Sequence, residues 1–525
     1  MNQRNANDPN IIIITTDQQR RDSLSCYGSD FTSTPHLDRL AASGVVCDRA
    51  YTPNPVCTPA RASLFSGQYM SHHGAWNVGM NVPEDTPMLS HRCNDLGYRT
   101  HYIGKAHFQA YMGLNQPPNN GSPTADSGSK ETRQADWESR FADWNGPYYG
   151  FDRVELCHGH STGGLGGHYG LWVKEQAAAA AADLESLNNA RPLSEAPKFG
   201  GRALDWDLPV AWHNSVWTAE RSIDFLKKRG GAAPFFLAIG FQDPHHPHAV
   251  PTDFDDRVDP ADVPLPRYQH GELDDKPPHF GLAHRGEIEQ SEFRGDYPIA
   301  GQGSSAGDTR EVSETDARQG RAYYYSMVKL IDQQVGRILR CLEEEGLADN
   351  TIVIFTSDHG ELLGDHGLWM KGPFHYEELV RIPLVVRWPQ GGVSGGRRVP
   401  GLCSLVDLVP SVLAALGETV PDECDGVDAM PLLRGESEAV REHSIVECTD
   451  DPRGLRLKTV VTENRKLTYY HGYEFGELYD LELDPGELVN RWSDPTYNAD
   501  RQQLMAILID HAERLEKRVE RLCYA

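Results

Sequence analysis

Two short polar pairs have the residue types that hold a divalent metal ion. Asp17-Gln18 follows the β-branched run at 11–16, and Asp358-His359 follows a similar run at 351–356. Together they offer two carboxylates, an amide oxygen and an imidazole. Oxygen donors favour Ca²⁺, Mg²⁺ or Mn²⁺, and the imidazole leaves a softer metal open. The sequence therefore predicts a divalent cation site, with Ca²⁺ as the preferred ion.

Basic side chains stand in the same position after two further apolar runs. Lys105 and His107 follow the run at 98–103, and His245 follows the run at 235–241. A single polar residue after a strand is usually a loop residue or a helix cap. Ligands of open α/β sheets, however, bind beyond the carboxyl ends of the strands. Because polar residues follow all four predicted strands, we expect them to form one functional site at the carboxyl edge of the sheet.

Cys57-Thr58-Pro59-Ala60-Arg61 is the most distinctive motif. Pro59 suits the first turn of a helix that runs to Gly67, which places Cys57 at the helix amino terminus, where an anion is favoured. The simplest interpretation is a half-buried cysteine before an ordinary helix. A phosphatase-type nucleophile is disfavoured, because its phosphate loop needs five residues between Cys and Arg and this chain has three.

Strands that alternate with helices are expected to position these residues. Helical patterns at 34–43, 215–229 and 319–345 lie between the four apolar runs, which predicts an α/β fold with a large, mostly parallel sheet flanked by helices. We assign 1–435 to this domain, with insertions at about 115–135 and 253–320.

The tail has a different pattern. Short alternating runs at 443–448, 455–462, 465–471 and 477–482 predict an antiparallel sheet in a smaller α+β domain, 436–525. A closing amphipathic helix carries on one face Leu504, Leu508, His511, Leu515, Val519 and Leu522.

Composition excludes several classes of protein. The 525 residues contain 50 Lys and Arg against 76 Asp and Glu, a net charge of −26. This balance argues against binding nucleic acid or an anionic membrane surface. No apolar run approaches the roughly 18 residues of a spanning helix, and the amino terminus lacks a signal pattern. We expect a cytoplasmic protein, or a periplasmic or secreted one if a signal was removed. The ten cysteines form no C-x-x-C pair.

In its surroundings, Asn54 to Gly67, the Cys57 motif resembles the signature of type I sulfatases, in the alkaline phosphatase superfamily. Four further segments match in the same order: the Asp17 pair, Gly104-Lys105-x-His107, Pro244-His245-His246-Pro247, and Ser357-Asp358-His359-Gly360 with the run to Lys371. The resemblance covers almost the entire chain. It implies a sulfuric ester hydrolase whose Cys57 is oxidised to formylglycine by a formylglycine-generating enzyme.

The resemblance also implies roles for the site residues. Hydrated formylglycine is a geminal diol, and one of its hydroxyls attacks sulfur and expels the alcohol. Arg61 and Lys105 would steady the nucleophile and the sulfate charge, and His245 and Lys371 would bind sulfate and help protonate the departing oxygen. His107 would then remove the proton of the second hydroxyl, so that sulfate leaves. The implied metal ligands are Asp17, Gln18, residue 57, Asp358 and His359.

Two residues depart from the commonest family pattern. Gln18 stands where a second Asp is frequent, and His359 stands where Asn is frequent. Both variants occur in the superfamily, including in phosphonate monoester hydrolases, whereas Lys105 and His107 match the sulfatase pattern. A sulfate monoester, either a sulfated saccharide or an aryl sulfate, is therefore the preferred substrate. The alternatives are a phosphonate monoester or phosphodiester hydrolase and an unmodified protein that binds a sulfated ligand. The alcohol and the oligomeric state stay open.

A Gly-rich stretch at 141–170 concentrates aromatic and imidazole side chains. They are Trp144, Tyr148, Tyr149, His158, His160, His168 and Tyr169. One hypothesis is a rim that contacts the alcohol part of the substrate. The other is a surface loop with a few packed aromatics.

Overall fold

The computed structural model describes residues 8–110, 129–131, 134–160, 165–193, 203–229, 233–288, 291–293, 308–450 and 454–516. Its largest sheet has the strand order β10-β2-β11-β9-β1-β7-β3-β4, with β12 paired to β2. The strands are β1 Asn10–Thr16, β2 Val45–Tyr51, β3 Arg99–Gly104, β4 Arg153–His158, β7 Phe235–Gly240, β9 Thr351–Ser357, β10 Arg381–Ile382, β11 Leu384–Arg387 and β12 Arg397–Ser404.

The centre of this sheet is parallel, as the sequence predicts. Strands β9, β1, β7, β3 and β4 pair in parallel, whereas β11 runs antiparallel to both β9 and β2. The four apolar runs of the sequence are β1, β3, β7 and β9. Both faces of β1 are buried, because Ile11 and Ile13 pack in one core and Ile12 and Ile14 pack in the other. A mostly parallel sheet with two covered faces is confirmed.

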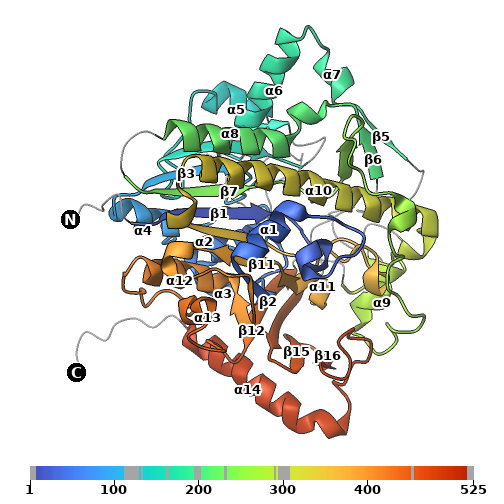
Figure 1. Cartoon of the computed structure of the whole chain (residues 1–525). Coiled ribbons are helices and arrows are strands. Elements are labelled where there is room, and N and C mark those ends of the chain that lie inside the picture. The colour runs from blue at the N-terminus through green and yellow to red at the C-terminus, as the bar shows by residue number, and fades with distance from the viewer. Residues whose placement is uncertain are drawn as a thin grey trace.

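Helices cover both faces of the sheet (Figure 1). One face packs against α1 Pro35–Ser43, α8 Asn214–Lys228 and α10 Glu314–Glu344. The other packs against α2 Cys57–Ser66, α4 Leu89–Asp95 and α12 Leu408–Ala415. The remaining α-helices of the described residues are α3 Met70–His73, α5 Gln134–Phe141, α6 Gly167–Ala179, α7 Leu184–Leu187, α9 Pro278–His284, α11 Glu377–Val380, α13 Met430–Arg434 and α14 Asn498–Arg514.

The tail forms the predicted antiparallel sheet. Its strands β13 Ser444–Asp450, β14 Leu455–Val461, β15 Arg465–Tyr470 and β16 Gly476–Asp480 pair in chain order. Helix α14 packs Leu504 and Leu508 against this sheet, at the bottom of Figure 1. Val519 and Leu522 of the predicted helix lie outside the described residues.

The structure describes more of the second predicted insertion than of the first. Most of 115–135 lies outside the described residues. The segment 253–320 contains α9 and the start of α10, although its sequence shows no periodicity. A small sheet of β5 Ala190–Pro192, β6 Ala203–Trp206 and β8 His248–Pro251 is also present and was not predicted.

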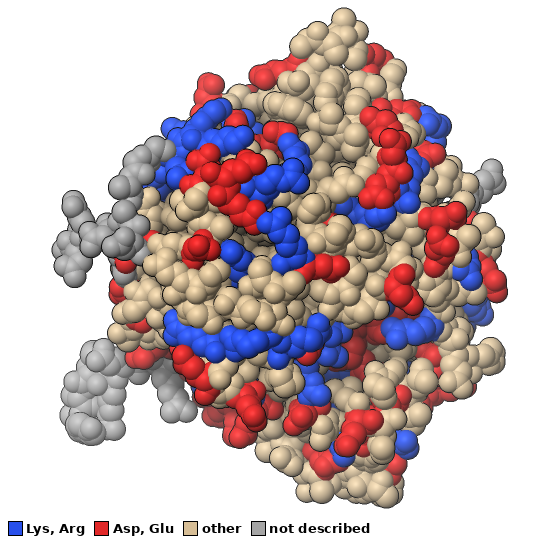
Figure 2. All heavy atoms as spheres, in the orientation of Figure 1, with Lys and Arg blue, Asp and Glu red and all other residues tan. Residues whose placement is uncertain are grey.

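The surface carries both signs of charge. Acidic and basic side chains are interspersed on the face shown in Figure 2. In the described part of the chain, no helix has both the length and the apolar composition needed to cross a membrane.

Candidate active site

Four adjacent strand ends bring the candidate residues to one edge of the sheet. Strands β9, β1, β7 and β3 are neighbours and run in the same direction. Asp358, Asp17 and Lys105 directly follow β9, β1 and β3, and His245 lies on the loop after β7. Because the carboxyl ends of parallel strands meet at one edge, residues far apart in the chain become neighbours.

Two glycines allow the ends of β3 and β7 to lie close together. A Cβ atom on Gly104 would lie 2.0 Å from the carbonyl oxygen of Gly240, and Gly104 has a φ of +99°. A Cβ atom on Gly240 would lie 2.2 Å from the carbonyl oxygen of Lys105. The Lys105 N–H donates to the Gly240 carbonyl at 2.7 Å. Only glycine fits this contact, which sets the position of Lys105.

Cys57 is the first residue of α2, and its side chain is buried. Its Sγ lies 2.8 Å from Lys371 Nζ, 3.2 Å from His359 Nε2 and 3.5 Å from Asp17 Oδ1. Burial, together with the charge of Asp17, raises the pKa of the Cys57 thiol to about 11. The predicted helix start is confirmed, and Gly67 ends the helix with a φ of +72°.

Arg61 lies one helical turn after Cys57 and is fully buried. Its Nε donates to Asp358 Oδ2 at 2.8 Å, and an Nη atom lies 3.5 Å from Asp17 Oδ2. Another Nη donates to the Lys105 carbonyl at 2.7 Å. Besides the Tyr102 hydroxyl, at 3.5 Å, the guanidinium thus contacts the two carboxylates and the backbone that carries Lys105, so that Arg61 holds three strand ends together.

The two oxygens of Asp17 face different partners. Oδ2 accepts from Lys105 Nζ, while Oδ1 faces Cys57 and His359 Nε2, the latter at 3.9 Å. Burial alone would raise the pKa of Asp17, but the positive charges of Lys105 and its neighbours outweigh it and hold that pKa well below the usual range. Asp17 is therefore a carboxylate with one oxygen directed at Cys57.

The donor set around Cys57 fits a divalent cation. Ligand atoms of Asp17, Cys57, Asp358 and His359 all lie within 4.8 Å of one another, and Gln18 Oε1 is buried with no hydrogen-bond partner among the described residues. Burial lowers the pKa of His359 to about 4. Its Nδ1 lies 2.8 Å from the Gly360 carbonyl, so Nδ1–H donates there and the Nε2 lone pair remains for a metal.

Imidazole and ammonium groups line the other side of Cys57. Lys371 Nζ lies 3.2 Å from both His245 Nε2 and His359 Nε2. The ring of His160 stacks on that of His245, with centroids 3.6 Å apart, and His160 also contacts Lys105. This arrangement gathers positive and hydrogen-bonding groups beside residue 57, where they could bind an oxyanion.

His160 is the site residue that sequence reasoning did not assign. It lies two residues beyond β4, a strand that the sequence pattern did not reveal. Its Nε2 lies 3.9 Å from Asp17 Oδ2, and burial lowers its pKa to about 4. The rule that located the other strand-end residues would have located His160 once β4 was known.

His107 is placed differently from the other predicted residues. Its backbone N–H donates to Glu131 Oε2 at 2.8 Å, and its ring centroid is 6.4 Å from that of His160. Nδ1 is buried without a hydrogen-bond partner in the described part of the chain. His107 therefore lies beside His160, whereas the hydrogen-bond contacts of Cys57 Sγ are with other groups.

Most of the aromatic side chains at 141–170 do not form a rim. Tyr148, Tyr149, His158 and Tyr169 are buried. Tyr148 and Tyr149 belong to the same core as Phe65 of α2. Tyr169 belongs to another buried cluster, so these tyrosines favour the interpretation of a loop with packed aromatics.

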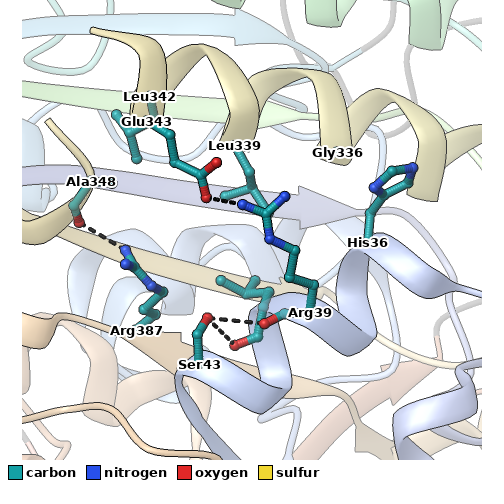
Figure 3. Close-up of a pocket in the computed structure, with 10 residues that line it drawn as sticks. His36, Arg39, Ser43, Gly336, Leu339, Leu342, Glu343, Ala348 and Arg387 are labelled. Atoms are coloured by element: carbon teal, nitrogen blue, oxygen red, sulfur yellow. Dashed lines mark hydrogen bonds and ion pairs between the residues drawn. The ribbon is translucent and has the colours of Figure 1, made fainter. Parts of the chain in front are cut away.

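A pocket lined by residues of α1 and α10 is a poor candidate (Figure 3). Its charged side chains already have partners, since Arg39 pairs with Glu343 and Arg387 donates to the Ala348 backbone carbonyl at 2.8 Å. Ala348 precedes the start of β9, so the pocket lies near the amino end of a strand whose carboxyl end carries Asp358.

Known proteins resemble this chain over nearly its whole length. Residues 9–418 match the family model described as Sulfatase, and 364–514 match one described as N-sulphoglucosamine sulphohydrolase, C-terminal. An arylsulfatase of Clostridium perfringens is 27% identical, covering 97% of this chain and 95% of the relative. A multifunctional alkaline phosphatase superfamily protein, PehA, of Trinickia caryophylli is 29% identical, with 96% of each chain covered. The structure of a phosphonate monoester hydrolase of Agrobacterium radiobacter aligns with a TM-score of 0.75 at 26% identity, covering 96% of each chain.

Proposed function

Because the chain belongs to the sulfatase family, we propose that it hydrolyses sulfate monoesters with a formylglycine at position 57 and a divalent cation beside it. The proposed ligands of the cation are Asp17, Gln18, Asp358, His359 and the side chain of residue 57. Ca²⁺ is the preferred ion, with Mg²⁺ and Mn²⁺ as alternatives, because oxygen donors dominate the set.

The position of Cys57 carries this proposal. The thiol occupies a helix amino terminus and faces an ammonium group, an imidazole and a carboxylate within 3.5 Å. An oxygen nucleophile at the same place would be in contact with both the proposed cation ligands and the cationic groups. A bound divalent cation would lower the pKa of a hydroxyl on residue 57.

Several side chains assist the first step, in which the sulfate group is transferred from the ester to residue 57. One hydroxyl of hydrated formylglycine, after losing its proton to solvent, forms a bond to sulfur, and the bond from sulfur to the ester oxygen breaks. Lys371 and His245, which lie 3.2 Å apart, are placed to hold the sulfate oxygens and to deliver a proton to the departing alcohol. Lys105 offsets the negative charge of Asp17, and Arg61 keeps the carboxylates of Asp17 and Asp358 in place.

The second step regenerates the aldehyde. A base removes the proton of the remaining hydroxyl, the carbonyl forms again, and sulfate leaves with the bonding electrons of the bond between carbon and oxygen. We assign this proton transfer to His107, which lies on the side of His160 and Lys105.

A phosphonate monoester hydrolase is the second candidate. Gln18 and His359 both belong to the proposed metal set, and both are residues that such hydrolases also use. The Agrobacterium radiobacter structure supports the same scaffold for this chemistry. Lys105 and His107 match the sulfatase pattern, so we keep sulfate as the preferred group.

The test begins with production of the chain together with a formylglycine-generating enzyme. The peptide that contains residue 57 should lose about 18 Da, because the aldehyde replaces the thiol. The modified enzyme should cleave an aryl sulfate faster than the phosphonate monoester with the same aryl group. The Cys57→Ala variant is the control, and it should fold normally and lose nearly all turnover. Full activity with only unmodified cysteine at position 57 would contradict the proposal.

A further inference from the structure

The backbone of Gln18 is held by hydrogen bonds at both its N–H and its carbonyl. Its backbone has a φ of +66°, a conformation that is uncommon for non-glycine residues. The Gln18 N–H donates to Asp358 Oδ1 at 3.0 Å, and its carbonyl accepts the hydroxyl of Tyr324 at 2.8 Å. The residue therefore has one backbone position, and only its side chain can turn.

Both hydrogens of the side-chain amide have an acceptor. Nε2 donates to Glu361 Oε2 and lies 3.2 Å from His246 Nδ1. Oε1 is buried and has no hydrogen-bond partner among the described residues. An amide can ligate a cation only through oxygen, so its orientation decides whether Gln18 can act as a ligand.

Glu361 is itself held independently of Gln18. Its Oε1 accepts the backbone N–H of Leu363 at 3.0 Å and also the N–H of Met370. Glu361 is almost completely buried, so it cannot turn to water. Its other oxygen, Oε2, is therefore fixed as an acceptor that faces the Gln18 side chain. It favours the NH₂ group of Gln18 over the amide oxygen at this contact.

We infer that Glu361 is a positioning residue that turns the oxygen of Gln18 toward the divalent cation. The inference rests on the metal site of the proposed function. It also explains why residue 18 is an amide in this chain. A carboxylate at position 18 would have to place one oxygen against Glu361 Oε2, and two buried carboxylates in contact repel each other.

Replacement of Glu361 by Gln gives a specific expectation. The N–H groups of Leu363 and Met370 would keep the oxygen of the new amide on their side. Its NH₂ group would then face Gln18 and require an acceptor there. The Gln18 amide would turn round, and an NH₂ group would face the cation in place of an oxygen.

The first experiment is calorimetric titration of metal-free enzyme, carrying the residue-57 modification, with Ca²⁺. We expect Glu361→Gln to weaken Ca²⁺ binding by about 10–100-fold, the range for residues that orient a metal ligand. In a Gln18→Glu background the same change should cause no loss, because a carboxylate at position 18 can accept from the new NH₂ group and still offer an oxygen to the ion. Equal weakening in both backgrounds, or none in either, would overturn the inference.

Glu477→Gln is the matched control. Glu477 is also a buried carboxylate with hydrogen-bonded partners, Tyr470 and Tyr479, but it lies in the C-terminal sheet. This variant should bind Ca²⁺ as the wild type does. An equal loss in Glu477→Gln would mean that the effect of Glu361 is general destabilisation, which would also overturn the inference.

A second measurement does not depend on the folding of any variant. In a high-resolution structure of the Ca²⁺-bound wild type, Gln18 Oε1 should lie about 2.3–2.6 Å from the ion, with Nε2 directed at Glu361. A bound ion without Gln18 among its ligands would overturn the inference and leave the proposed function intact. Failure of the wild type to bind Ca²⁺, Mg²⁺ or Mn²⁺ would instead overturn the metal site of the proposed function itself.

Discussion

His245 and His107 occupy different surroundings, which separates their expected effects on catalysis. His245 Nε2 lies 3.2 Å from Lys371, whose Nζ contacts Cys57, whereas His107 is anchored through its backbone to Glu131. Loss of His245 should slow departure of the alcohol, and the effect should shrink as that alcohol becomes more acidic. Loss of His107 should slow sulfate release for every leaving group.

A series of aryl sulfates with graded leaving-group acidity, measured on wild type, His245→Ala and His107→Ala, checks this prediction. Mass spectrometry of His107→Ala during turnover should show a sulfated peptide at residue 57. If the rates of both variants depend on leaving-group acidity in the same way, the assignment of His245 and His107 to different steps is wrong. His246 then becomes the next residue to test.

His160 provides a second prediction at the scale of single residues. Its ring supports His245 from one side and contacts Lys105 with a nitrogen. His160→Ala should lower kcat/KM about a hundredfold, because both neighbours lose their position. His160→Phe keeps the ring that stacks on His245 but removes the nitrogen that contacts Lys105, so its kcat/KM should lie between those of His160→Ala and the wild type. The exposed His471 is the control, and His471→Phe should leave kcat/KM unchanged. Full activity of His160→Phe would show that stacking alone is sufficient.

The sequence predicted the site residues that follow apolar strands, and it missed one that follows an amphipathic strand. Asp17 and Asp358 stand after continuous apolar runs, so their convergence could be deduced before the structure. His160 follows β4, whose Arg153 and Glu155 interrupt the apolar pattern. The partners of Gln18 could not be deduced at all, because contact between residues 18 and 361 depends on side-chain packing across two strand ends.

At the scale of elements, the contact between the ends of β3 and β7 can be tested with two glycines. Gly104 and Gly28 have nearly the same φ, +99° and +98°. A Cβ atom on Gly104 would meet the Gly240 carbonyl at 2.0 Å, whereas a Cβ atom on Gly28 would meet nothing within 4 Å. Gly28→Ala therefore measures the backbone strain alone, and Gly104→Ala measures strain plus steric overlap.

We expect Gly28→Ala to lower the free energy of unfolding by about 1 kcal/mol and Gly104→Ala by about 3 kcal/mol or more. Gly104→Ala should also reduce kcat/KM about a hundredfold, because the strand end that carries Lys105 must shift. Urea unfolding and aryl sulfate kinetics of both variants give the two quantities. Equal losses of stability would show that β3 can move away from β7 without cost.

The elements themselves were predictable to different degrees. Parallel central strands have continuous apolar sequences because both of their faces are buried, so β1, β3, β7 and β9 could be recognised. Strand β11 has four residues, and its antiparallel position between β9 and β2 is set by contacts with strands distant in the chain. Such pairings leave no periodic signal in a short segment.

At the scale of the whole molecule, Glu447 connects the C-terminal sheet with the large domain. It lies on β13 and is fully buried. Its carboxylate accepts the Ser71 N–H of α3 at 2.8 Å and lies 3.0 Å from His511 Nε2 of α14, and it also pairs with Lys458 of β14. Burial alone would raise the pKa of Glu447, but His511 and Lys458 outweigh it and hold that pKa below its usual value.

Glu447→Gln should lower the free energy of unfolding by about 3 kcal/mol at pH 7, because Lys458 and the buried His511 lose the carboxylate charge that they face. The folded-state pKa is depressed, so the stabilisation by Glu447 is present above the unfolded-state pKa of about 4.3 and is lost as the pH falls through the folded-state value. The difference between wild type and variant should therefore shrink from pH 7 to pH 3.5 in urea unfolding. Glu463→Gln is the control, because Glu463 is 80% exposed. It should change stability by less than about 0.5 kcal/mol. A pH-independent difference for Glu447→Gln would contradict the assignment.

The same strand has a consequence for the time at which Cys57 becomes enclosed during synthesis. The side-chain NH₂ of Asn54 donates to the Glu447 carbonyl at 2.7 Å, across a chain separation of 393 residues, and the Glu447 N–H donates to the Pro53 carbonyl at 2.8 Å. The segment that leads into Cys57 therefore cannot reach its final contacts until β13 has left the ribosome. At the usual 5–20 residues per second, translation of the intervening chain takes about 20–80 s. Under the proposed function, a formylglycine-generating enzyme would have an interval of that length in which to act on Cys57, before residues 53 and 54 form their hydrogen bonds to Glu447.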